Sequence, residues 1–156
     1  TLSASGVTLA LTATHFENFW GSTSNDTISG AASTITLVVV GDAGNDIMST
    51  GSAGDFLYGM SGNDTLAAGG GNDNLVGGEG ADVFRYNTAS FGTDLIWDFE
   101  KGIDHINMNG TGVAAFGQLT IATVGGNSKI TSAATGASEI WLVGVTGLTA
   151  ADFVFA

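Results

Sequence analysis

The chain has 156 residues, of which 15 are acidic and 3 are basic, so its formal net charge is −12. Three basic residues cannot neutralise a phosphate backbone or an anionic lipid surface, which argues against nucleic acid and acidic membranes as partners. The absence of cysteine excludes disulfides, thiolate metal sites and cysteine nucleophiles. Because 44% of the residues are hydrophobic and no apolar run reaches about 18 residues, the sequence predicts a folded domain without a membrane span.

Residues 1–16 alternate apolar and small side chains, which predicts a strand that starts or caps the structure. From residue 17 onward, an acid is followed two positions later by an apolar residue: Glu17 with Phe19, then Asp26 with Ile28. For Glu17 a surface acid and a ligand are equally consistent readings. Residues 30–40 contain no acid and resemble one repeat stretched to eleven residues, with a strand buried on both faces near Val40.

A nine-residue repeat occupies residues 41–85. The five copies read GDAGNDIMS, TGSAGDFLY, GMSGNDTLA, AGGGNDNLV and GGEGADVFR. The sixth position is Asp in every copy, and the fourth is Gly in all but the second. The eighth position is always apolar, occupied by Met48, Leu57, Leu66, Leu75 and Phe84. This pattern resembles the calcium-binding repeat of RTX proteins, in which stacking of neighbouring units buries a continuous core.

The chemistry of the repeat favours a calcium-binding parallel β-roll, which is an all-β fold. Ca²⁺ prefers six to eight oxygen ligands, and a glycine-rich turn can aim backbone carbonyls at an ion while Asp adds a charged oxygen. Nine residues make one turn and one strand of two to four residues, so equivalent turns stack every 18 residues. The spacing pairs Asp46 with Asp64, Asp64 with Asp82 and Asp55 with Asp73, and it places the eighth-position side chains inside. With further sites at Asp26 and Asp94, we expect three to five calcium ions.

The turn residues are the predicted ligands, through carboxylates at the sixth position and through backbone carbonyls elsewhere. They are Asp26, Gly41, Ala43, Gly44, Asp46, Ala53, Asp55, Gly59, Ser61, Gly62, Asp64, Gly69, Gly71, Asp73, Gly77, Glu79 and Asp82.

The C-terminal third has a different character. Residues 93–108 alternate apolar residues with acids and predict two short strands around residues 100–102. Further strands are expected at Leu119 to Val124, Lys129 to Ser132 and Glu139 to Val145, with a single helical turn capped by Thr149. The predicted organisation is therefore an N-terminal cap at residues 1–16, a roll at 17–92 and a small antiparallel or mixed β cap at 93–156.

The segments GGEGADVFRY and TDLIWDFEKGIDHINM resemble the C-terminal region of RTX exoproteins of Gram-negative bacteria. Serralysin-type metalloproteases and the R-modules of mannuronan C-5 epimerases share that region, and the resemblance covers roughly residues 17–156. It implies that Asp94 ligates the last calcium of the roll, with Asp98 a weaker candidate. It also implies export by a type I secretion system that reads an uncleaved C-terminal signal, which the ending at residues 152–156 fits.

No catalytic motif is visible, since both the H-E-x-x-H zinc motif and the G-x-S-x-G elbow are missing. We therefore expect a non-catalytic module, with calcium and the type I secretion apparatus as partners. One hypothesis is a secreted module that folds on extracellular calcium and supports export of a larger exoprotein, with a catalytic domain upstream. The alternative is an extracellular structural or adhesive subunit, in a surface layer, a biofilm matrix or bound to a surface polysaccharide. A polyanionic glycan fits poorly, because three basic residues offer it little unless calcium bridges.

Overall fold

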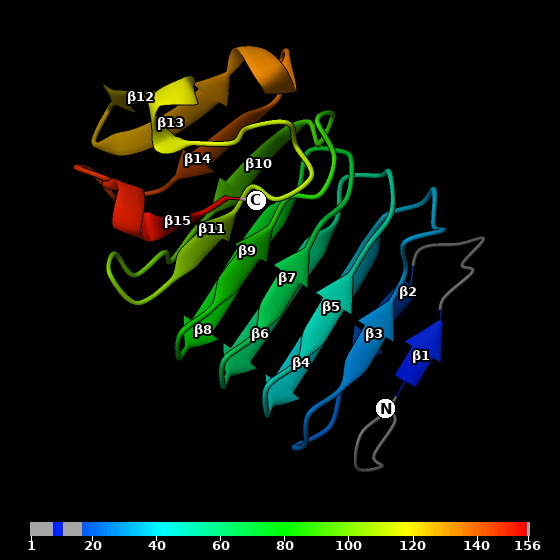
Figure 1. The fold of residues 1–156 in the computed structure, drawn as a ribbon. Helices are drawn as coiled ribbons and strands as arrows, with labels where there is room; N and C mark the ends of the chain where they lie inside the picture. The colour runs from blue at the N-terminus through cyan, green and yellow to red at the C-terminus, as the bar shows by residue number, and fades with distance from the viewer. Residues whose placement is uncertain (1–7, 11–16, 156) are drawn as a thin grey trace.

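The computed structural model describes residues 8–10 and 17–155. Two sheets stack face to face, and the chain passes from one to the other at each turn of a parallel β-roll (Figure 1). Sheet A contains β1 (Thr8–Ala10), β3 (Thr27–Ser29), β5 (Ile47–Ser49), β7 (Thr65–Ala67), β9 (Val83–Arg85), β11 (His105–Asn107) and β15 (Phe153–Val154), in that spatial order. Within the expected N-terminal cap, β1 is the described part, and the other residues of 1–16 lie outside the described residues.

Sheet B starts at β2 and carries the longer strands. Its members are β2 (Glu17–Trp20), β4 (Leu37–Ala43), β6 (Phe56–Ser61), β8 (Asn74–Glu79), β10 (Thr93–Ile96), β14 (Glu139–Leu142), β13 (Asn127–Ser132) and β12 (Leu119–Val124). The pairing is parallel from β2 to β14 and antiparallel between β14, β13 and β12. The C-terminal third therefore forms the predicted mixed β region, and its strands extend both sheets of the roll (Figure 1).

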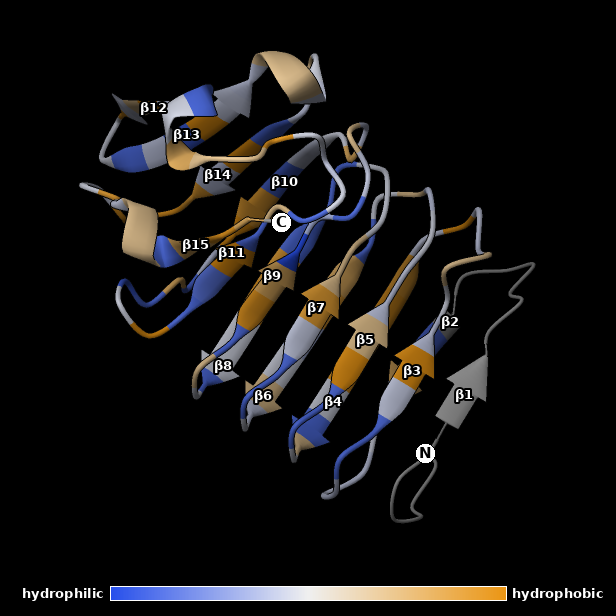
Figure 2. Ribbon diagram, viewed as in Figure 1, coloured by the Kyte–Doolittle hydropathy of each residue, from blue (hydrophilic) through white to orange (hydrophobic). Residues whose placement is uncertain are grey.

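The register follows the nine-residue repeat. Partners lie 18 residues apart where Met48 meets Leu66 and where Leu57 meets Leu75. All five eighth-position side chains are buried between the sheets, as predicted. Between β3 and β5 the offset is 20 residues, because residues 30–36 hold the two extra positions anticipated from the sequence. Figure 2 shows the result as hydrophobic strand centres joined by hydrophilic turns.

The expected strand length of two to four residues was wrong for sheet B, where β4 has seven residues and β6 and β8 have six. These strands continue into the following turns, where Asp42 pairs with Met60 and Met60 with Gly78. The turns stack in the same register as the strands, so their backbone groups bond to the next turn: the N–H of Gly44 donates to the carbonyl of Ser61 at 2.9 Å. Pairing therefore extends beyond the apolar residues that mark a strand in the sequence.

Three short 3₁₀ helices complete the chain. They are η1 (Phe116–Gln118), η2 (Ala133–Thr135) and η3 (Ala150–Asp152). The last is the helical turn expected after Thr149, and the carboxylate of Asp152 accepts the backbone N–H of Thr149 at 2.7 Å. No helix in the described part of the chain is long and apolar enough to cross a membrane.

Candidate metal centre: two rows of aspartates

The turns that join the sheets form two stacks on opposite edges of the roll. Row one leads from sheet B into sheet A and contains Asp26, Asp46, Asp64, Asp82 and Asp104. Row two leads from sheet A into sheet B and contains Asp55, Asp73 and Asp94. All eight of these aspartates are buried, with at most 2% of each residue exposed. The pairs predicted from the spacing are therefore neighbours in the fold.

Each neighbouring pair is joined in the same way. The backbone N–H of Asp46 donates to Oδ1 of Asp64, and that of Asp64 donates to Oδ1 of Asp82, at 2.7 and 2.8 Å. In row two the N–H of Asp55 donates to Oδ1 of Asp73 at 2.7 Å, and the N–H of Asp73 donates to Oδ1 of Asp94 at 3.0 Å. One oxygen of each carboxylate thus fixes the register of adjacent turns, and the other is left for a different role.

The second oxygens are the most informative feature of the site. Oδ2 of Asp46, Asp55, Asp64, Asp73, Asp82 and Asp94 is buried and has no hydrogen-bond partner among the described residues. A buried charged oxygen without a donor is costly, so six in register require a common explanation. A cation beside each of these oxygens would supply the missing partner.

The surroundings of these oxygens contain further acceptors. A Cβ placed on Gly59 would clash with both Oδ2 of Asp64 and the carbonyl oxygen of Gly77. A Cβ on Gly41 would likewise meet Oδ2 of Asp46 and the carbonyl of Gly59, and one on Gly21 would meet Oδ2 of Asp26 and the carbonyl of Gly41. At each of these three glycines, a carboxylate oxygen and a carbonyl oxygen lie beside the space that a larger side chain would fill. Hard cations such as Ca²⁺ favour such oxygen sets, so the residues present fit the ion.

The remaining predicted ligands lie on the same turns. Gly44, Gly62, Gly71 and Gly80, at the fourth position, have φ between 124° and 135°, a conformation that only glycine adopts readily. Ala53 occupies that position in the second copy and is not among the residues with positive φ. Several residues were predicted to ligate calcium through their backbone carbonyls. In row one these include Ala43, Ser61, Gly77 and Glu79, and in row two they include Gly69.

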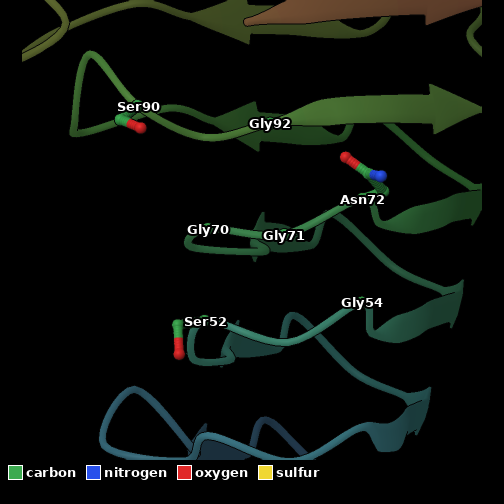
Figure 3. Close-up of a pocket in the computed structure, with 7 residues that line it drawn as sticks. All are labelled: Ser52, Gly54, Gly70, Gly71, Asn72, Ser90 and Gly92. Atoms are coloured by element: carbon green, nitrogen blue, oxygen red, sulfur yellow. The ribbon is translucent and has the colours of Figure 1, made fainter.

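Row two is open to solvent along a shallow groove. Figure 3 shows three successive turns stacked with Ser52 and Gly54, Gly70 to Asn72, and Ser90 and Gly92 along it. A Cβ on Gly71 would clash with the carbonyl of Ala53, so the backbones of adjacent turns are in close contact.

Burial raises the pKa of these aspartates, since a charge is disfavoured away from water. Desolvation, with the charges of Asp94 and Asp55 added, raises the pKa of Asp73 to about 8. Desolvation raises the pKa of Asp94 to about 7 and those of Asp64 and Asp82 to about 6, with neighbouring acids of row one contributing to the last two. A bound cation would offset this penalty and keep the carboxylates ionised.

The two ends of row one differ from its middle. Oδ2 of Asp26 accepts the backbone N–H of Ser22 at 2.5 Å and its hydroxyl at 3.0 Å. The resemblance assigned Asp98 a weaker role, and its carboxylate accepts the N–H groups of Gly77 at 3.0 Å and Gly78 at 2.8 Å. Asp98 therefore covers the last repeat turn of row one, whereas Asp94 continues row two.

Sequence reasoning missed two features. Asp104 extends row one, because its Oδ1 accepts the N–H of Asp82 at 2.9 Å and its Oδ2 accepts that of Glu100 at 2.8 Å. The offset of 22 residues from Asp82 hid it from the nine-residue count, although it lies in the segment TDLIWDFEKGIDHINM that carries the resemblance. The second feature is a ladder of asparagines at the fifth position of the turns. Side-chain oxygens of Asn25, Asn45, Asn63 and Asn72 each accept a backbone N–H from the next turn.

Within residues 8–10 and 17–155, no group of three or more His, Cys, Asp or Glu side chains is placed to hold one metal ion. This agrees with sites in which two carboxylates at most join several backbone carbonyls. Tyr86 lies beside row two with its hydroxyl buried and outside hydrogen-bond geometry to any described group. Its desolvation and the nearby Asp94 raise its pKa well above the ordinary value.

Comparisons with known proteins agree with this geometry. The profile of the RTX calcium-binding nonapeptide repeat (4 copies) matches residues 15–34, 38–57 and 49–84. The fold is therefore a parallel β-roll, and its residues 15–84 contain repeats that match the RTX calcium-binding nonapeptide. No curated protein sequence matched the chain.

Several solved structures share the fold, and three of them are compared with the chain. The AlgE6R3 subunit of the mannuronan C5-epimerase from Azotobacter vinelandii is 25% identical with a TM-score of 0.55, over 94% of this chain and 82% of that subunit. The AlgE6R2 subunit is 27% identical with a TM-score of 0.51, over 88% of this chain and 91% of that one. The extracellular lipase LipA of Serratia marcescens is 16% identical with a TM-score of 0.51, and the match covers 90% of this chain and 38% of the lipase. The chain thus resembles RTX modules of larger proteins.

Proposed function

We propose that this chain is a non-catalytic RTX module that folds when it meets extracellular calcium and thereby supports type I secretion of a larger exoprotein. The observation that supports this most strongly is the set of six buried, unpartnered Oδ2 atoms in register along two rows. The residues that would hold the ions are the aspartates of both rows and the carbonyls of their turns. Bound calcium would supply positive charge between acids that otherwise repel one another.

Calcium binding should be coupled to folding. The sites are assembled from turns 18 or more residues apart, so they do not exist in the unfolded chain. In chelator, the core between two narrow sheets would have to offset both chain entropy and the repulsion of a chain with net charge −12. Extracellular modules bind calcium with constants of about 10⁻⁴–10⁻³ M, so the cytosol would leave such sites empty and the outside would fill them.

We assign the proposed export role to the segment that contains β15, in which Phe153 is buried and β15 pairs with β11. Any apparatus that reads this segment must therefore meet it before the chain folds. Cytosolic unfolding and external folding would satisfy that requirement, with calcium as the signal that the chain is outside.

The proposed ion count is three to five, from the intervals at Asp26–Asp46, Asp46–Asp64, Asp64–Asp82, Asp55–Asp73 and Asp73–Asp94. The Asp82–Asp104 interval has the same backbone link and is a candidate for one more. We divide the chain into a roll at residues 17–92 and a segment at residues 93–156 that serves as the cap and the secretion segment.

The test is circular dichroism of the purified chain in chelator, followed by addition of calcium at about 1 mM. We expect a disordered spectrum that converts to a β spectrum with a cooperative thermal transition. Magnesium at equal concentration is the control, since its smaller ion demands a tighter octahedral site and should convert little of the chain. A β spectrum and a cooperative melt already present in chelator, and unchanged by calcium, would contradict the proposal.

A further inference from the structure

The outer face of sheet B carries all three tryptophans of the chain, Trp20, Trp97 and Trp141. Leu57, Leu75 and Ile96 point inward, so the alternating residues beside them point away from the core. Trp20 is 54% exposed and Trp97 is 49% exposed, which is unusual for the largest apolar side chain. Phe56 and Tyr58 lie between them on β6, so the face is an aromatic platform on the sheet.

The aromatic side chains follow the strand register. Trp20 is opposite Val40, Val40 is opposite Tyr58, and Tyr58 is opposite Val76. Trp97 directly follows β10, and its backbone N–H donates to the carbonyl of Leu75, which places it beside Val76. One ring therefore occurs on every second strand, at a spacing of about 9.5 Å because adjacent strands lie about 4.8 Å apart.

Hydrogen bonds hold two of the indoles. Nε1 of Trp97 donates to Oδ1 of Asn74 at 3.0 Å, and Nε1 of Trp141 donates to Oε2 of Glu139 at 2.9 Å. The Lys129 ammonium lies 5.4 Å from the centre of the Trp141 ring and forms an ion pair with Glu139. Exposed rings that are already oriented lose little entropy when a ligand covers them.

We propose that this platform, defined by Trp20, Phe56, Tyr58, Asn74, Trp97 and Trp141, binds a neutral, extended β-linked glycan chain. The apolar C–H face of a pyranose packs on an aromatic ring, and the polar groups between the rings can bond to sugar hydroxyls. In a β-1,4-linked glucan each sugar is turned over relative to the next, so equivalent faces recur at every second sugar. That repeat is close to the separation of alternate strands.

The charge of the chain favours a neutral glycan over two other occupants of the platform, a polyanionic glycan and a second copy of the chain. A polyanionic glycan would meet a chain with 15 acidic and three basic residues, which keeps a negative net charge even with three to five calcium ions bound, and one of the basic residues, Lys129, is already paired with Glu139 on this face. A second copy of the chain would bring the same charge to the interface. A neutral glycan carries no such repulsion. This binding site goes beyond the proposed calcium-dependent folding and is tested with the folded, calcium-loaded chain.

The experiment is titration of the chain in millimolar calcium with cellohexaose, followed by intrinsic tryptophan fluorescence and calorimetry. All three fluorophores lie on the platform, so we expect a saturable change in emission. Maltohexaose, whose α-linked chain curves away from a flat face, should bind more weakly. Alginate oligosaccharide tests the anionic alternative and should not compete.

Trp97→Ala should weaken cellohexaose binding by about tenfold or more, because a stacked ring is lost. Trp97→Phe should restore most of the affinity by keeping an aromatic surface. Ile47→Ala is the matched control, since Ile47 is 52% exposed on the other sheet and should leave binding unchanged. Circular dichroism in calcium checks that each variant is folded.

Absence of a saturable signal with cellohexaose, or equal binding by the parent chain and Trp97→Ala, would overturn the proposal. Alginate binding that does not depend on Trp97 would place a glycan site elsewhere and would also overturn it. A dimer in sedimentation velocity that Trp97→Ala dissociates would identify a second copy as the occupant instead. None of these results would alter calcium-induced folding, so the two proposals fail separately.

Discussion

Row one and row two follow the same nine-residue pattern but end differently. Row one runs through five aspartates to Asp104, whereas row two holds three, and apolar residues take the equivalent places at its ends. At one end, the backbone N–H of Leu37 donates to Oδ1 of Asp55, and at the other end Ile140 pairs with Asp94. The side chains of Leu37 and Ile140 are fully buried. Row two therefore terminates in the hydrophobic core, while row one terminates in acids whose oxygens accept backbone N–H groups.

The comparison shows that the hydrogen-bond register of a turn does not depend on an acid in that turn. The backbone link to the next turn persists where Leu37 replaces an aspartate, so register does not require an acid on both sides. The proposed ion sites, in contrast, need oxygens from both turns. Position in a row should therefore determine how much calcium a substitution costs.

The largest effect is expected for Asp64→Ala, because Asp64 lies in the middle of row one between Asp46 and Asp82. It should remove about two bound ions and lower the melting temperature in calcium, since two intervals lose a carboxylate and the Asp46 N–H loses its acceptor. Asp55→Ala, at the end of row two next to Leu37, should remove about one. Calorimetric titration and thermal unfolding measure both. Equal, single-ion losses would argue against stacked sites that share aspartates.

A second prediction uses glycine at the first position of the turn. In row one this position is Gly59, where a Cβ would clash with Oδ2 of Asp64 and the carbonyl of Gly77. In row two it is already Thr50 or Ala68, so a Cβ is tolerated there. Gly59→Ala should therefore weaken calcium at one row-one site by about tenfold without changing any charge.

Gly70→Ala is the matched control for this substitution. Gly70 lies in a row-two turn, its φ is compatible with alanine, and the nearest atom to its Cβ would be the carbonyl oxygen of Ser90 at 3.6 Å. Its calcium titration should match that of the parent chain. If Gly59→Ala also titrates like the parent, the space beside Asp64 is not part of an ion site.

A third prediction separates the rows by pH in chelator. The folded chain has raised pKa values of about 8 and 7 for Asp73 and Asp94 and about 6 for Asp64 and Asp82, against 3.8 ordinarily. The folded state therefore binds more protons than the unfolded state. Its stability from these groups is complete below about pH 4 and is lost as pH rises through 6 to 8.

Acidification from pH 8 to pH 5 should accordingly increase the folded fraction without calcium, with row two protonating first. Circular dichroism follows folding, and carbon NMR of the Asp carboxyl groups resolves the rows. Asp73→Asn should remove the part of the transition nearest pH 8. In calcium the trend reverses, because protons compete with the ion for the same carboxylates. A folded fraction in chelator that does not vary between pH 5 and pH 8 would contradict these shifts.

Much of this fold could be predicted from the sequence because the repeat couples an apolar position to a turn of fixed length. Met48, Leu66 and Phe84 fall on one sheet, and Leu57 and Leu75 on the other, as a nine-residue period requires. The strand lengths of sheet B could not be predicted, since turn residues such as Asp42 and Gly78 pair without any apolar signal.

The sequence missed two parts of the site, for different reasons. Asp104 stands 22 residues after Asp82, four more than two repeats: three extra residues lie between β9 and β10, which also set the 21-residue offset of Asp94 from Asp73, and one lies between β10 and β11. The asparagine ladder was visible at the fifth position of several copies, but an amide there is equally common in simple turns. Its role depends on contacts 18 to 21 residues away, which only the register reveals.

The smallest expected effect sharpens the comparison at the end of row one, where Asp104→Asn tests whether the acid continues the ion-binding row. The amide oxygen can still accept the N–H of Asp82, but the amide nitrogen would face the N–H of Glu100, so about 1 kcal/mol of stability should be lost. If the Asp82–Asp104 interval binds calcium, one weak site should also lose about tenfold in affinity while the other sites titrate unchanged.

Asp152→Asn is the matched control: Asp152 is equally buried and accepts N–H groups of Gly102 and Thr149, but it lies off the row. It should lower the melting temperature by a similar amount in chelator-free buffer and leave every calcium site as it was. Identical calcium titrations for the two variants would end row one at Asp82 and make Asp104 a structural cap, as Leu37 is for row two.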